Sequence, residues 1–194
     1  MAKTLTTPSL RLAYDFTHGH LRAEGRLAEC AATGQSPAPL RLVWHQIYPE
    51  KLAAAEELAE RAVAVSRAHD YEQACALIGQ AIDLDPLNPK LRATRSHWET
   101  YAELVRAIRS EKLDPAAVIS WAAERGIGSD QLRSLWHALF PERGTRAVQL
   151  AKRAAAAIWE RQPDVAVATG CEALQLDPFN ALLRQAVARW RQAE

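Results

Sequence analysis

The sequence LRLVWHQIYPEK, residues 40–51, decides the fold because it returns as LRSLWHALFPER at residues 132–143. At this offset of 92 positions, the segment 40–98 aligns with 132–190 without a gap. Further on, AIDLDPLNPKLR in the first copy meets ALQLDPFNALLR in the second. Roughly a third of the aligned positions are identical, which indicates an internal duplication. Upstream, Leu21 falls on Leu113 and Gly34 on Gly126, so the repeated unit is expected to include the preceding helices.

Helix start and stop signals divide both copies at matching places. In the second copy, Asp114 is predicted to cap one helix and Gly126 to end it. Ser129 or Asp130 is predicted to cap the next helix, and Pro141 to end that helix and open another. The alternation typical of strands is absent. The first copy yields expected helices at about 38–47, 51–68, 71–84 and 89–110, and the second copy yields equivalent ones.

Composition supports a helical reading of the whole chain. Of the 194 residues, 48% are hydrophobic and 24% charged, as in an ordinary globular protein. Leu and Ala dominate the apolar set, which favours helix over strand. The predicted class is therefore all-α, a tandem duplication with helical-repeat architecture. Its first unit is expected at residues 1–101 and its second at 102–194.

The net charge and the targeting signals indicate which classes of partner and which compartment to expect. The formal net charge is +1, and neither half forms a basic arm or an acidic tail. Nucleic acid is therefore an unlikely partner, and neither a signal peptide nor a membrane span is evident. Three scattered cysteines, Cys30, Cys75 and Cys171, are typical of buried free thiols in a reducing compartment. These features predict a cytoplasmic protein.

The stretch from Ala55 to about Leu87 resembles a tetratricopeptide repeat, a pair of antiparallel helices. In that family small residues lie where the two helices cross, and a proline closes the second helix. The second matching hairpin lies at about 147–179. Arg61 and Arg153 occupy a normally apolar position, and Gly170 replaces a large residue. The matching positions are Leu58, Ala62, Val65, Ala74, Ile78, Ala81 and Pro86 in the first copy, and Leu150, Ala154, Ala157, Ala166, Ala173 and Pro178 in the second.

Few residues lie in sequence patterns that are typical of catalytic or metal-binding sites. His18 and His20, with Asp15 nearby, are the one local cluster of metal-ligand type, and a surface turn explains them better. No catalytic motif, metal site or cofactor site is predicted. The pairs Trp44-His45 and Trp136-His137 have two interpretations. Either tryptophan belongs to the buried stripe with histidine at its edge, or the paired histidines line a pocket.

The tetratricopeptide resemblance implies protein or peptide binding through a concave surface. The leading hypothesis is a non-enzymatic interaction scaffold, an accessory or adaptor subunit of a larger assembly. A homo-oligomer is compatible with it. The alternatives are a nucleic-acid-binding helical repeat that uses basic faces of the second unit, and an enzyme built around the Trp-His pairs. The residues predicted to bind a partner are Arg61, Arg153, His45, His137 and Arg146.

Overall fold

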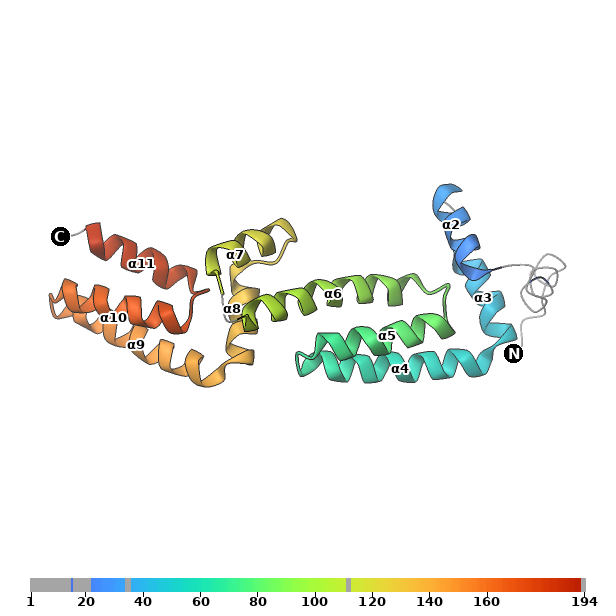
Figure 1. Ribbon diagram of the computed structural model, residues 1–194, viewed down its shortest axis with the longest axis horizontal. Helices are drawn as coiled ribbons and strands as arrows, with labels where there is room; N and C mark the ends of the chain where they lie inside the picture. Colours follow the sequence, from blue (N-terminus) through green and yellow to red (C-terminus); the bar gives the residue numbers. More distant parts are fainter. Residues whose placement is uncertain (1–14, 16–21, 34–35, 111–112, 193–194) are drawn as a thin grey trace. The chain divides into compact units, whose positions relative to one another are not determined.

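The computed structural model describes Asp15 and residues 22–33, 36–110 and 113–192 (Figure 1). All regular secondary structure in these residues is α-helical, which confirms the predicted all-α class. The chain divides into two compact units, Met1–Glu103 and Leu104–Glu194. Helix α6 (Pro89–Arg109) runs across this division.

The helices recur at the same spacing as the sequence. Before α6, the first unit contains α2 (Ala23–Thr33), α3 (Ala38–Ile47), α4 (Pro49–Arg67) and α5 (Tyr71–Leu84). The second unit contains α7 (Pro115–Glu124), α8 (Ser129–Leu139), α9 (Pro141–Trp159), α10 (Pro163–Leu176) and α11 (Ala181–Gln192). The bounds of α9 and α10 are those of α4 and α5 moved by 92 positions, and α11 begins 92 positions after α6.

A helical hairpin occupies the same place in each unit. Helices α4 and α5 pack side by side, as do α9 and α10 (Figure 1). His69 and Arg161, 92 positions apart, end the first helix of each hairpin with positive φ angles of 60° and 56°. Asp70 then caps α5 by accepting a hydrogen bond from Gln73 N at 3.1 Å, whereas α10 begins at Pro163.

Most helix ends follow the sequence signals. The Asp114 carboxylate accepts from the backbone N–H groups at the start of α7, and Gly126, with φ of 73°, follows its end. Pro141 is the first residue of α9. The prediction that Ser129 or Asp130 caps α8 is wrong, because the cap is Gly128. Its backbone N–H donates to the side chain of Gln131 at 2.9 Å, so Ser129 already lies inside the first turn.

Buried alanines mark the closest approach of the paired helices. Their small side chains let the helix backbones approach each other and leave little empty volume. Larger apolar residues close the cores from the side, among them Leu58 and Val65 in the first unit. The alanines with no exposed surface include Ala62, Ala74 and Ala81 in the first unit and Ala154, Ala166 and Ala173 in the second. These are packing positions of the tetratricopeptide resemblance, which itself stays a prediction.

The tryptophans of the duplicated stripes lie against the cores. Trp136 and Trp98 are buried, with 2% and 8% of their surface exposed. Trp44 and Trp190 are partly buried, and Trp190 packs against the second core. Two of the four tryptophans are therefore buried in the cores, and the other two are only partly buried.

One glycine of the second unit compensates for larger neighbours. Gly170 on α10 lies where the first unit has Ile78 on α5. A Cβ atom at Gly170 would meet Val187 Cγ2 at 2.6 Å and Trp190 Cζ3 at 3.2 Å. The missing side chain therefore makes room for α11 to pack on α10.

Gly170→Ala is expected to lower the free energy of unfolding by about 1–2 kcal/mol, because overpacking outweighs the gain in helix propensity. Gly79→Ala, on α5, is the matched control. A Cβ there meets Arg95 Nη1 no closer than 3.6 Å, so a gain of about 0.5–1 kcal/mol is expected. Chemical denaturation of the two variants checks the pair, and equal effects at both positions would contradict this account of α11 packing.

Candidate functional site: a groove beside a buried clamp

A buried carboxylate joins two segments of the first unit, α3 and the turn between α5 and α6. Asp85, which is 1% exposed, follows the end of α5. Its Oδ2 atom accepts hydrogen bonds from Arg41 Nη2 at 2.8 Å and from Asn88 Nδ2 at 2.9 Å. His45 Nε2 lies 3.3 Å from the same oxygen. Because Arg41 and His45 are one turn apart on α3, the carboxylate fixes α3 to the turn between α5 and α6.

The environment of Asp85 keeps the carboxyl group ionised. Burial alone would raise its pKa, since an apolar surrounding disfavours the charged form. Hydrogen bonds from Arg41 and Asn88, the charge of Arg41 and the nearby His45 imidazole outweigh burial and hold the pKa of Asp85 below its ordinary value. Asp85 therefore carries a compensated negative charge at neutral pH.

The second unit repeats this arrangement around Asp177, which has no exposed surface. Asp177 Oδ2 lies 2.7 Å from Arg133 Nε, 3.0 Å from His137 Nε2 and 3.4 Å from Asn180 Nδ2. Each of these residues is 92 positions from its counterpart in the first unit. We call the two groups the Asp85 clamp and the Asp177 clamp.

Further hydrogen bonds close the same turn in both units. Trp44 Nε1 donates to the carbonyl of Leu84 at 3.1 Å, and Trp136 Nε1 donates to that of Leu176 at 2.9 Å. Both carbonyls belong to the last residue of their helix, where no intrahelical partner exists. In the second unit Arg184 donates to the carbonyl of Pro178, as Arg92 does to Pro86 at 3.0 Å. The duplicated tryptophans thus attach α3 to the end of α5, and α8 to the end of α10.

The clamps explain the repeated Trp-His pairs, whose histidines face a buried carboxylate. Sequence reasoning singled out the pairs but missed the aspartates that receive them. A signal was present, because Asp and Asn recur at matching positions of LDPLN and LDPFN in an otherwise apolar setting. Buried polar residues require partners, so their repetition could have predicted the clamp.

A groove lies beside the Asp177 clamp and consists of two adjoining hollows that share Pro115, Leu174 and Pro178. The first hollow, of about 460 Å³, contains the edge of Trp136 and the side chain of Arg143. Arg143 Cζ lies 5.3 Å from the centre of the Phe140 ring, which supports the guanidinium group. The other residues that line this hollow are Leu113, Cys171 and Gln175.

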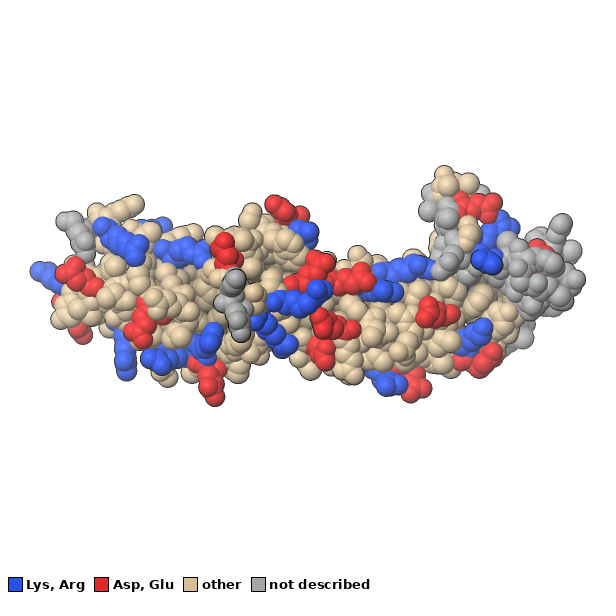
Figure 2. All heavy atoms as spheres, viewed as in Figure 1, with Lys and Arg blue, Asp and Glu red and all other residues tan. Residues whose placement is uncertain are grey.

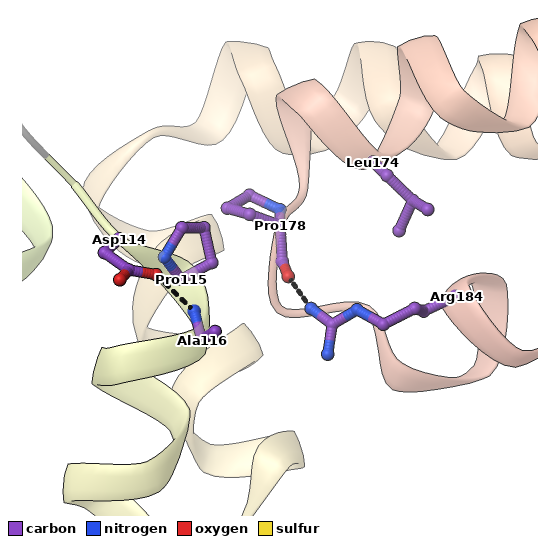
Figure 3. A pocket seen from close by; sticks show the side chains of 6 residues that line it. All are labelled: Asp114, Pro115, Ala116, Leu174, Pro178 and Arg184. Carbon is purple, nitrogen blue, oxygen red and sulfur yellow. Dashed lines mark hydrogen bonds between the residues drawn. The ribbon is translucent and has the colours of Figure 1, made fainter.

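The second hollow, of about 410 Å³, brings the start of α7 together with the α10–α11 turn (Figure 3). Arg184 lies at its rim and donates one hydrogen bond to the Pro178 carbonyl. The Asp114 carboxylate already accepts hydrogen bonds from the backbone N–H groups of Ala116 and Ala117, at 3.0 and 3.3 Å. We call the two hollows together the second-unit groove.

The groove combines an apolar floor with two guanidinium groups. Pro115, Leu174 and Pro178 offer surface for an apolar side chain. A guanidinium group has five N–H donors and suits a carboxylate. Arg184 donates from one nitrogen, Nη2, to the Pro178 carbonyl, and its other nitrogens can still donate to a ligand. The chemistry therefore fits an extended segment that presents apolar residues next to an acidic one.

The residues predicted to bind a partner are not gathered in this groove. His45 and His137 belong to the clamps, with 18% and 31% of their side-chain surfaces exposed. Arg61 and Arg153 are exposed on α4 and α9. Arg146 Nη2 lies 3.5 Å from Glu172 on the surface. Their roles in binding stay predictions.

The three cysteines are free. Cys30 is buried, whereas Cys75 and Cys171 are partly exposed, so the expectation of burial is too strong for two of them. Cys171 Sγ lies 3.0 Å from Arg191 Nη2, on the surface of the second unit. No disulfide links these residues.

Comparison with protein-family models, with curated proteins and with solved structures found no match to the chain. Within the described ranges, no helix is long and apolar enough to cross a membrane. The same residues contain no group of three or more His, Cys, Asp or Glu side chains arranged to hold a metal ion. His18 and His20 lie outside the described residues.

Proposed function

We propose that the chain is a non-enzymatic protein–protein interaction scaffold, a cytoplasmic accessory or adaptor subunit that holds a segment of its partner in the second-unit groove. The observation that carries the proposal is the groove itself, with its apolar floor and the guanidinium groups of Arg143 and Arg184. Grooves between neighbouring helices are a recurrent way to bind a peptide. The tetratricopeptide resemblance implies the same kind of partner.

The duplicated clamps favour a scaffold over an enzyme built on the Trp-His pairs. A catalytic histidine must reach the substrate, whereas Nε2 of His45 and of His137 faces a buried aspartate. The tryptophan N–H groups are likewise bonded to helix-end carbonyls. Both copies therefore use these residues to hold helices together.

A nucleic-acid-binding function is the second candidate, because the second unit carries exposed basic residues on α9 and α11. Against it, Arg146 is paired with Glu172, and Arg191 contacts Cys171. Figure 2 shows acidic and basic side chains mixed on the visible face of the molecule. The exposed basic residues of these two helices are Arg143, Arg146, Lys152, Arg153, Arg184, Arg189 and Arg191.

Filling the groove is expected to remove the partner without unfolding the protein. Ala116 is exposed and lines the groove, and its cap bond uses a backbone N–H, so Ala116→Trp should block the site and keep α7 intact. Ala117→Trp is the matched control, since Ala117 is also exposed and is not among the lining residues. Affinity purification from the native host with quantitative mass spectrometry should show a partner lost by at least about tenfold with Ala116→Trp alone. Equal recovery with both variants would remove the groove from the binding site.

A further inference from the structure

We infer that α4 of one copy of this chain binds the end of α9 of a second copy, with Trp159 seated in a hollow on α4. Trp159, the last residue of α9, has 88% of its surface exposed. Tryptophan is enriched at the centres of protein interfaces and is costly to leave in water. The equivalent position of the first unit is Arg67, so the duplicated fold does not require an aromatic residue here.

The hollow lies on the outer face of α4 and measures about 370 Å³. Its apolar wall consists of Ala59, Val63 and Ala64, and Val63 is 39% exposed. Glu60 and Arg67 complete the lining. This set suits an indole ring, because a carboxylate accepts from the indole N–H and a guanidinium group stacks on an aromatic face.

Charge complementarity identifies a second copy as the occupant. Near the hollow, α4 exposes Glu56 and Glu57. Near Trp159, α9 exposes Lys152 and Arg153. Among the described residues, none of these four charges makes an ion pair or a side-chain hydrogen bond within the chain. At these positions α4 is therefore acidic and α9 basic, and each helix also carries an exposed apolar residue.

The spacing of the residues fixes a register between the two helices. Trp159 follows Lys152 by seven residues, and Val63 follows Glu56 by seven. Two parallel helices that set Trp159 against Val63 thus bring Lys152 opposite Glu56, two helical turns earlier, with Arg153 and Glu57 flanking this pair. An antiparallel arrangement would carry Lys152 past the end of α4 at Arg67. The contact joins different surfaces of two chains, so it builds head-to-tail assemblies.

Sedimentation velocity of the full chain tests the inference over about 1 μM to 1 mM. The wild-type mass should rise above 21.5 kDa with concentration. Trp159→Ser should weaken association at least about tenfold, as expected for a central aromatic anchor. Leu182→Ser is the control, since Leu182 is 76% exposed on α11 and lies outside both surfaces. Circular dichroism confirms that each variant is folded.

Charge reversal makes the test specific for these two helices. The variants Glu56→Lys/Glu57→Lys and Lys152→Glu/Arg153→Glu should each stay at the mass of one chain, because α4 and α9 then carry the same sign. Mixing the two variants should restore association, since each chain offers the charge that the other lacks. A wild-type chain that keeps a mass of 21.5 kDa, association unchanged by Trp159→Ser, or a mixture without recovery would each overturn the inference. Ala116→Trp should leave association unchanged, which separates this contact from the second-unit groove.

Discussion

Trp136→Ala is expected to lower the free energy of unfolding by about 3–5 kcal/mol, the range for removing a fully packed large aromatic side chain. Trp136 is 2% exposed and contacts the rings of Phe140 and Phe179 at centroid distances of 4.6 and 5.5 Å. The substitution also leaves the Leu176 carbonyl without its indole donor. Chemical denaturation followed by circular dichroism measures the loss.

The control for this prediction is Trp159→Ala, measured at a concentration below any association. Trp159 is 88% exposed, so its removal should change the free energy of unfolding by less than about 1 kcal/mol. A loss below about 1 kcal/mol for Trp136→Ala as well would place Trp136 outside the core and return it to the candidate binding residues.

Asp85→Ala is expected to cost about 3 kcal/mol at neutral pH, the low end of the range for breaking a buried ion pair. The low end applies because Arg41 keeps 30% of its side-chain surface in solvent and retains part of its hydration. Asp83→Ala, at an exposed position of α5 two residues before Asp85, should change the free energy of unfolding by less than about 0.5 kcal/mol. Similar losses at both positions would mean that the Asp85 clamp does not stabilise the fold.

The Asp85 clamp also gives stability a pH dependence with a defined sign. The folded-state pKa of Asp85 lies below its ordinary value, so the unfolded chain binds the proton more readily. The contribution is therefore complete above the unfolded pKa of about 3.9 and is lost as the pH falls through the folded value. Urea denaturation should show the gap between wild type and Asp85→Ala narrowing below about pH 4. A gap that stays constant down to pH 2 would contradict an ionised Asp85.

Local signals in the sequence predicted the helices well. Proline and an N-cap aspartate act on neighbouring backbone groups. The helix starts at Pro141 and after Asp114 could therefore be predicted without knowledge of the fold. The cap of α8 was missed because Gly128 acts through its backbone N–H and a side chain three residues later. Glycine carries no side-chain signal for such a role.

The groove and the clamps were harder to predict because they join distant positions. Pro115, Leu174 and Arg184 meet only after three helices have folded. The register of α8 against the α10–α11 turn depends on the bond between Arg133 and Asp177, 44 residues apart. Periodicity reports which face of a helix is buried and carries no information about the partner that covers it.

The proposed binding of a protein segment in the second-unit groove predicts an affinity that depends only weakly on salt. The direct measurement is the affinity of the purified chain for its captured partner as the salt concentration rises from 50 to 200 mM. Two arginine contacts and an apolar floor predict a loss of about tenfold or less, with binding unaffected by nuclease. A loss of about 10³-fold or more, abolished by nuclease treatment, would contradict the account and assign the basic faces of α9 and α11 to nucleic acid.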